Sequence, residues 1–178
     1  MITDFFLALF LSLIQGLTEF LPVSSSAHLL FPSLIFGAKD FGIVFDISVH
    51  AGTLAAVIYY FKKEIHGLIQ AWKPWTNDRD QQNYFLGLNL LVATLPIIIV
   101  GLFFSDFTES RFANTNSIAW TNLIFAVLLY VVFRFSAQSK SLAELTLTAA
   151  LIIGCFQALA IFPGASRSGM AITGALLI

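Results

Sequence analysis

Long apolar runs separated by short charged loops dominate the chain. Three runs contain no charged residue: 85–104, 112–133 and 145–166. Each approaches or exceeds the roughly 20 residues with which a helix spans the hydrocarbon core of a bilayer. A shorter run at 47–61 reaches that length if it begins near Ile43. A span that begins there places Asp46 and His50 within the hydrocarbon core. The pattern predicts an all-α, polytopic membrane protein.

The first and last segments have a different form. A helix interrupted by Pro22 and the serines after it is followed by an apolar return, 27–36, that is too short to span a bilayer. A re-entrant hairpin over 1–37 fits this pattern better than two crossings. The end of the chain repeats the form, with a break at 163–169. It predicts a second re-entrant hairpin over 143–178, which is truncated.

The orientation of the spans follows from the charged loops. Three transmembrane helices are expected between the hairpins, within 43–136: 44–62, 84–104 and 117–135. The loops at 61–84 and 133–143 hold six Lys and Arg residues, whereas the other two loops hold only Lys39 and Arg111. Because Lys and Arg are enriched in cytoplasmic loops, the two basic loops are predicted to lie in the cytoplasm.

The two hairpins also resemble each other in sequence. Gln15–Pro22 parallels Gln157–Pro163 with one residue dropped, and a serine-containing turn follows each proline. An odd number of spans between them makes the hairpins enter from opposite faces, the first from outside. Broken helices in such an arrangement are typical of an inverted-topology repeat. We therefore interpret 1–178 as a single membrane domain whose second repeat is incomplete.

The composition supports a bilayer as the natural solvent. Hydrophobic residues make up 58% of the chain and charged residues 11%, against about half and a quarter in soluble domains. The net charge of −1 gives no reason to expect a nucleic-acid partner. One cysteine excludes a disulfide framework.

The first break and its flanks contain several polar residues. Because polar groups are costly within a membrane, their presence in an apolar hairpin indicates a function. They are Gln15, Glu19, Ser24, Ser25, Ser26 and His28. Serine hydroxyls and free backbone N–H groups at a helix start suit a phosphate, although serines also cap broken helices. Glu19 could instead be a structural carboxyl, and His28 could be a proton donor, a nucleophile or a cap residue.

The second break adds a guanidinium. Arg167, between Ser166 and Ser168, is the only Arg or Lys after Lys140. A guanidinium at membrane depth needs an anion, and its fork matches phosphate oxygens. Alternatively it pairs with Glu19. A carboxylate, hydroxyls, an imidazole and a guanidinium together suit phosphoryl transfer, and the carboxylate could hold a divalent cation. The chain has no P-loop motif.

These two breaks carry the motifs of a known family. QGLTEFLPVSSSAHL at 15–29 and PGASRSG at 163–169 resemble the two signatures of the bacitracin-resistance type undecaprenyl-diphosphatases. The resemblance implies a hydrolase acting on a phosphoric anhydride, undecaprenyl diphosphate, to give the monophosphate and phosphate. That reaction recycles the carrier lipid of peptidoglycan synthesis and confers resistance to bacitracin. The resemblance further implies a multi-pass protein of the bacterial inner membrane, a site open toward the periplasm and assistance by Mg²⁺ or Ca²⁺.

The resemblance also implies roles by motif position. The catalytic residues are expected to be Glu19, Ser25, His28 and Arg167. Phosphate binding is expected from Ser24, Ser26, Ser166, Ser168 and Arg167. A cation is expected at Glu19 and Gln15, although an amide at position 15 can neither act as a base nor bring charge to a metal. The nucleophile is Ser25 or His28; we favour Ser25, with His28 as acid and base.

Two rival hypotheses come from other functional classes. A lipid or small-solute transporter, such as a flippase, also uses inverted repeats with broken helices. An inactive fragment would follow from the truncation. The sequence leaves a homodimer open.

Overall fold

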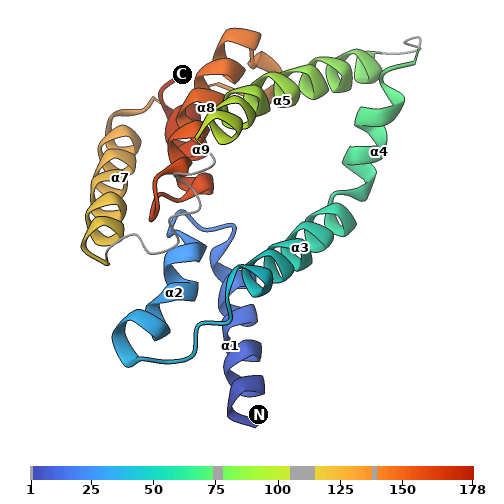
Figure 1. Cartoon of the computed structure of the whole chain (residues 1–178). Helices are drawn as coiled ribbons and strands as arrows, with labels where there is room; N and C mark the ends of the chain where they lie inside the picture. Colours follow the sequence, from blue (N-terminus) through green and yellow to red (C-terminus); the bar gives the residue numbers. More distant parts are fainter. Residues whose placement is uncertain (1, 74–77, 105–114, 138–139) are drawn as a thin grey trace.

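Helices make up the regular structure of the chain. The computed structural model describes residues 2–73, 78–104, 115–137 and 140–178, and these residues contain no strand (Figure 1). The helices are α1 (Ile2–Thr18), α2 (Ser25–Phe36), α3 (Ile43–Tyr60), α4 (Lys62–Gln70), α5 (Asp78–Phe103), α7 (Thr115–Phe135), η1 (Leu142–Glu144), α8 (Leu147–Ala158), η2 (Leu159–Ile161) and α9 (Arg167–Leu176). The predicted all-α class is confirmed.

Three of these helices are long and apolar enough to cross a membrane. They are Ile43–Tyr60, Asp80–Phe103 and Asn116–Phe135. They lie where three spans were predicted, but two limits differ. The first span ends at Tyr60 because α4 follows at Lys62, and α5 begins at Asp78, before the predicted start at 84. The predicted loop residues 74–77, 105–114 and 138–139 lie outside the described part.

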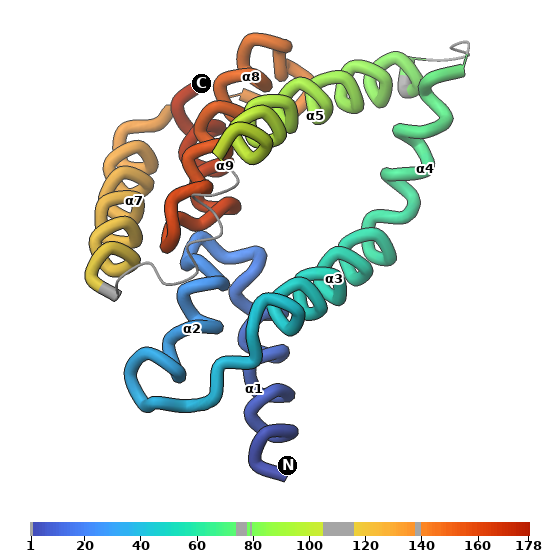
Figure 2. The backbone as a smooth tube through the Cα atoms, in the orientation of Figure 1, coloured from blue at the N-terminus to red at the C-terminus, as the bar shows by residue number. Residues whose placement is uncertain are grey.

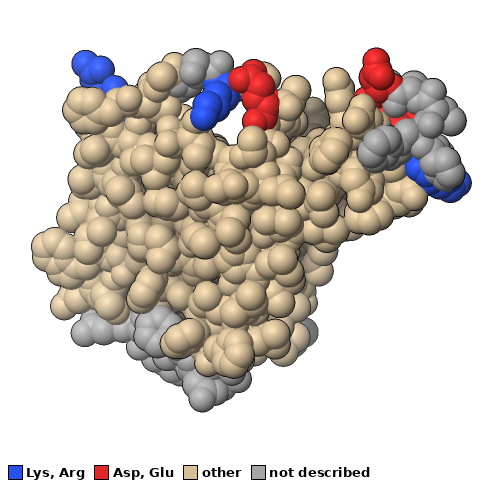
Figure 3. All heavy atoms as spheres, turned by 90° about the horizontal axis from the view of Figure 1, so that it is seen from above, with Lys and Arg blue, Asp and Glu red and all other residues tan. Residues whose placement is uncertain are grey.

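The surface of these helices suits lipid. Helix α3 has no buried residue, although it is apolar along its length. On the face shown in Figure 3, the Lys, Arg, Asp and Glu residues that are coloured lie along one edge, and the other described residues on this face are uncharged. Large apolar surfaces of this kind are rare on soluble monomers. The chain is therefore a membrane protein.

Both predicted hairpins have the form helix, break, helix. In the first, α1 ends at Thr18 and α2 starts at Ser25. In the second, η2 extends α8 to Ile161, and α9 starts at Arg167. Entry into the membrane from opposite faces, and the inverted repeat, stay predictions.

The C-terminal half holds the packed core. Helix α8 packs against α5 and α9, and α9 also packs against α7 (Figure 2). The backbones approach closely at Gly154, where a Cβ would lie 2.4 Å from the carbonyl oxygen of Ala93 on α5. Small residues permit such approach between membrane helices. This core fixes the position of the second break.

Candidate functional site

The two breaks touch each other. The Oγ of Ser168 donates a hydrogen bond of 2.8 Å to the carbonyl oxygen of Leu21, and the Oγ of Ser166 lies 3.4 Å from the same oxygen. A Cβ on Gly169 would lie 3.3 Å from the Cβ of Pro22. The serines of the second break therefore bind the backbone of the first, a role that sequence reasoning did not foresee for them.

A small cavity of about 100 Å³, which we name the polar pocket, lies where the breaks meet. It is lined by Glu19, Ser24, Ser25, Ser26, His50, Ala160, Ala165, Ser166 and Arg167. The structure thus brings most of the expected site residues to one place. Glu19 and Arg167 share the pocket but form no ion pair within the described part of the chain. The structural bridge considered from the sequence is therefore not formed, and the roles of these residues stay predictions.

Glu19 is held in a fixed orientation. Its Oε2 accepts hydrogen bonds from the Oγ of Ser25 at 2.6 Å and from the Nε2 of Gln15 at 2.7 Å. Gln15 lies one turn earlier on α1 and is fully buried. Short bonds to a carboxylate are charge-assisted and comparatively strong. A hydroxyl that donates directly to a carboxylate has the geometry of a nucleophile beside its base.

Ser24 has two features that cost free energy. Its φ of 57° lies in the left-handed region, which non-glycine residues rarely adopt. The residue is 2% exposed, and its Oγ has no hydrogen-bond partner among the described residues. A buried polar group without a partner destabilises the fold. Ser24 is also one of the residues that line the polar pocket.

Arg167 occupies the first position of α9. Ser166 caps this helix, since its Oγ accepts from the backbone N–H of Gly169 at 3.1 Å. The preceding turn requires glycine at 164, where φ is 92° and a Cβ would lie 2.6 Å from the carbonyl oxygen of Ile118. A cation at a helix N-terminus adds to the positive end of the helix dipole. The N-terminus of α2 also lies at the pocket. Together the two helix N-termini and Arg167 contribute a positive electrostatic potential to the pocket, which favours an anion.

The two histidines near the site differ in position. His28 is exposed on α2, its Nδ1–H donates to the carbonyl oxygen of Ser24 at 2.9 Å, and it does not line the polar pocket. His50 on α3 does line the pocket, with Nε2 3.6 Å from the Oε2 of Glu19. Its Nδ1–H donates to the carbonyl oxygen of Asp46 at 2.7 Å. Sequence reasoning missed His50, although its place inside a predicted span was a signal.

The described residues offer little for a metal held by protein alone. No group of three His, Cys, Asp or Glu side chains is found among them. Gln15 contacts Glu19 but does not line the pocket, and its Oε1 has no hydrogen-bond partner among these residues. Mg²⁺ is usually bound by one or two carboxylates together with substrate phosphates. The single carboxylate of Glu19 therefore fits a cation that is shared with a bound diphosphate.

Comparisons with known proteins agree on one family. The family model of the bacitracin resistance protein BacA matches residues 8–178. The undecaprenyl-diphosphatase of Saccharophagus degradans is 46% identical over 98% of this chain and 66% of its own length. Those of Teredinibacter turnerae and Aliivibrio salmonicida are 47% and 43% identical, over 94% and 98% of this chain and 64% and 66% of their own lengths. The chain thus spans just under two thirds of the curated relatives that it matches.

Proposed function

Because this chain belongs to the BacA family of bacitracin resistance proteins, we propose that it hydrolyses undecaprenyl diphosphate to undecaprenyl phosphate and inorganic phosphate. The proposal rests on one observation above all. The polar pocket is lined both by Ser25, whose hydroxyl is bonded to the carboxylate of Glu19, and by Arg167 at the N-terminus of α9. The reaction would recycle the carrier lipid of peptidoglycan synthesis and confer resistance to bacitracin.

Four residues that line the pocket have a part in the proposed reaction: Glu19, Ser24, Ser25 and Arg167. Arg167, the hydroxyl of Ser24 and the first N–H groups of α2 bind the terminal phosphate and stabilise the charge that develops on it. The Oγ of Ser25 attacks the terminal phosphorus in line as its proton passes to Glu19. The bond from phosphorus to the bridging oxygen breaks, and undecaprenyl phosphate leaves with the proton that Glu19 accepted, so that Glu19 is a free carboxylate again.

Water completes the cycle. A water molecule attacks the phosphoserine on Ser25, Glu19 takes its proton, and phosphate leaves as the serine oxygen regains a proton. His28, the other nucleophile considered from the sequence, would first have to move to the pocket. The geometry therefore favours Ser25, with Glu19 rather than His28 as its base.

A divalent cation, Mg²⁺ or Ca²⁺, belongs to this proposal as well. Glu19 would hold it together with the diphosphate oxygens, and when bound it would neutralise part of their charge. Gln15 supports the carboxylate through its amide N–H rather than contacting the cation.

The proposed location is the bacterial inner membrane, with the polar pocket open toward the periplasm. The support is the excess of Lys and Arg in the loops at 61–84 and 133–143, which favours their position in the cytoplasm. The transporter hypothesis gains no support, since the relatives are named as diphosphatases.

Phosphate release by purified protein in nanodiscs tests the function. With undecaprenyl diphosphate as substrate, Glu19→Gln, Ser25→Ala and Arg167→Ala should each lower kcat/KM by about a hundredfold or more. Arg167→Lys should recover little, because an ammonium cannot form two parallel bonds to phosphate. Analytical ultracentrifugation of the same protein measures its mass and so tests whether it forms a homodimer, which the sequence left open.

A matched control lies on the same helix as Ser25. Ser33 on α2 donates only to the carbonyl oxygen of Leu30 and is outside the polar pocket. Ser33→Ala should therefore retain parental activity. Near-normal turnover by Arg167→Ala would refute the assignment of the anion site.

A further inference from the structure

The polar pocket is too small for a lipid, but it adjoins a larger cavity. This second cavity, of about 390 Å³, lies between α2, α3, α5, α7 and the second break, and we name it the bridging cavity. The two share four lining residues: Ser26, Ala160, Ala165 and Arg167. The two cavities are therefore adjacent, and the bridging cavity extends from the polar pocket toward α5.

A third cavity continues the path. It has a volume of about 630 Å³ and lies between α5 and the segment of α8 and η2, and we name it the apolar groove. Its lining includes Pro96, Val100, Phe104, Cys155, Leu159 and Phe162. It shares Val100, Ile161 and Phe162 with the bridging cavity. Both volumes fall in the range of about 300–1,000 Å³ that is typical of ligand sites.

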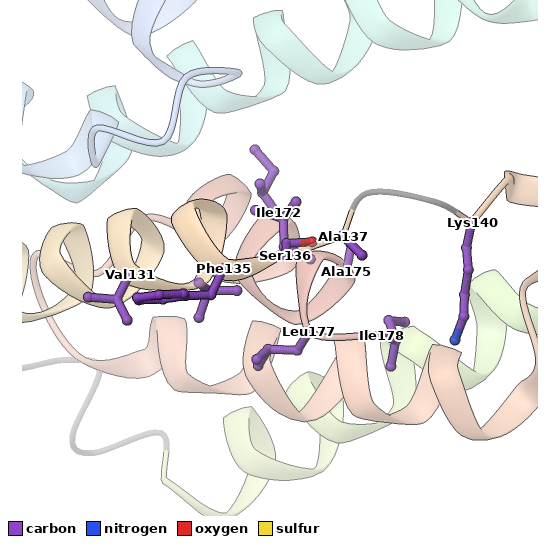
Figure 4. A pocket seen from close by; sticks show the side chains of 11 residues that line it. Val131, Phe135, Ser136, Ala137, Lys140, Ile172, Ala175, Leu177 and Ile178 are labelled. Carbon is purple, nitrogen blue, oxygen red and sulfur yellow. The ribbon is translucent and has the colours of Figure 1, made fainter.

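Another large cavity does not belong to this path. It has a volume of about 650 Å³ and lies between the ends of α7 and α9, with Lys140 at its margin (Figure 4). It shares no lining residue with the polar pocket, the bridging cavity or the apolar groove. The apolar groove, by contrast, shares lining residues with the bridging cavity, which in turn shares lining residues with the polar pocket.

We propose that the bridging cavity and the apolar groove bind the polyprenyl chain of the substrate whose diphosphate occupies the polar pocket. The inference rests on the proposed function, since it assigns the tail of the same lipid. A headgroup at Arg167 places the first isoprene units against Val100 and the following ones beside Cys155. Because a prenyl chain leaves lipid that is as apolar as the groove, packing and position rather than transfer from water decide the binding.

The single cysteine of the chain provides a direct readout. Cys155 lines the apolar groove and is exposed. In nanodiscs, farnesyl diphosphate should slow alkylation of Cys155 by a lipid-soluble maleimide about tenfold when roughly nine sites in ten are occupied. Isopentenyl diphosphate, which is too short to reach Cys155, should leave the alkylation rate unchanged.

Two substitutions on α5 test where the prenyl chain binds. Val100 lines both cavities, so Val100→Trp should abolish protection of Cys155 by farnesyl diphosphate and raise its KM without a matching fall in kcat. Ile98 is exposed on the same helix and lines none of these cavities, so Ile98→Trp should behave like the parent.

The outcomes separate the tail site from the proposed function. Normal phosphate release from farnesyl diphosphate without protection of Cys155 would overturn the tail site and leave the function standing. Protection of Cys155 without phosphate release would leave the tail site and refute the function. Equal protection by farnesol would overturn the claim that headgroup and tail occupy one continuous site.

Discussion

The two hairpins of this protein share a form but differ in what they bury. In the first hairpin, two of the four buried residues are polar, Gln15 and Ser24, and both adjoin Glu19 or the pocket. In the second, the buried residues are mostly small or apolar, and α8 and α9 pack against α5 and α7. The second hairpin is a packed scaffold that positions Arg167. In the first hairpin, by contrast, half of the buried residues belong to the site or adjoin it.

The breaks differ in the same sense. Each contains one residue with positive φ: Ser24 at 57° in the first break and Gly164 at 92° in the second. Glycine adopts such a conformation without steric cost, whereas serine does not. Strain of this kind concentrates at functional sites. The first break therefore carries the strain, and the second break is relaxed.

The largest effect that tests this contrast comes from a matched pair of glycines. A Cβ at Gly154 on α8 would lie 2.4 Å from the backbone oxygen of Ala93, whereas a Cβ at Gly16 on α1 meets nothing within 4 Å. Gly154→Ala should destabilise the protein by about 3 kcal/mol, because backbone must shift. Gly16→Ala should be neutral or stabilise by up to about 1 kcal/mol. Thermal unfolding in detergent measures both, and equal losses would refute the scaffold assignment.

A smaller effect is expected from His50, which lies on the spanning helix α3 and lines the polar pocket beside Glu19. His50→Ala removes the imidazole beside Glu19, and kcat should fall about thirtyfold, or about 2 kcal/mol, as the carboxylate loses its neighbour. His66 on α4 contacts Gln70 and lies outside the polar pocket, so His66→Ala is the control. Unchanged kcat in His50→Ala would exclude His50 from the reaction.

The strained serine gives the next effect. Ser24→Ala should raise KM about tenfold, or about 1.4 kcal/mol, because it removes a donor to the phosphate. Its stability should not fall, since the Oγ has no partner in the described part of the chain. Ser24→Gly should raise KM equally but also stabilise by about 1 kcal/mol, because glycine tolerates φ of 57°. Parental KM in both variants would refute phosphate binding by Ser24.

The fold was largely predictable because its signals are local in sequence. Uncharged runs of spanning length located the helices near 84–104 and 117–135, and a shorter apolar run located the helix near 44–62. Proline with serine or glycine located both breaks. Helix limits were less predictable: α5 begins at Asp78, several residues before the predicted start at 84. Polar residues continue that helix beyond its apolar part, so hydropathy does not mark its start.

The site was predictable only where its residues belong to the breaks. Glu19, Ser25 and Arg167 stand in the motifs, and the structure brings them to one pocket. His50 was missed because it reaches the pocket from α3 through tertiary packing, which no spacing in the sequence records. The contact of Ser168 with Leu21 likewise depends on how the breaks meet, 147 residues apart.

The smallest effect is expected at the end of the first hairpin that lies away from the break. An ion pair between Lys39 and Asp4 joins the chain there. Lys39 Nζ lies 3.3 Å from the Oδ2 of Asp4, and both side chains are exposed. The hydrogen bond from Lys39 and its charge hold the pKa of Asp4 below its ordinary value of 3.8. A carboxyl with a lowered pKa contributes stability that is present above its ordinary pKa and is lost as pH falls through the pKa in the folded protein.

Lys39→Gln should therefore lower the midpoint of thermal unfolding only slightly at neutral pH, because exposed ion pairs contribute little and salt screens them. The difference from the parent should vanish once the pH falls well below 3.8, where Asp4 is protonated in both proteins. Unfolding scans at neutral and acidic pH, with low and high salt, measure it. A loss as large as that of Gly154→Ala would show that the first hairpin depends on this ion pair as the second depends on its packing.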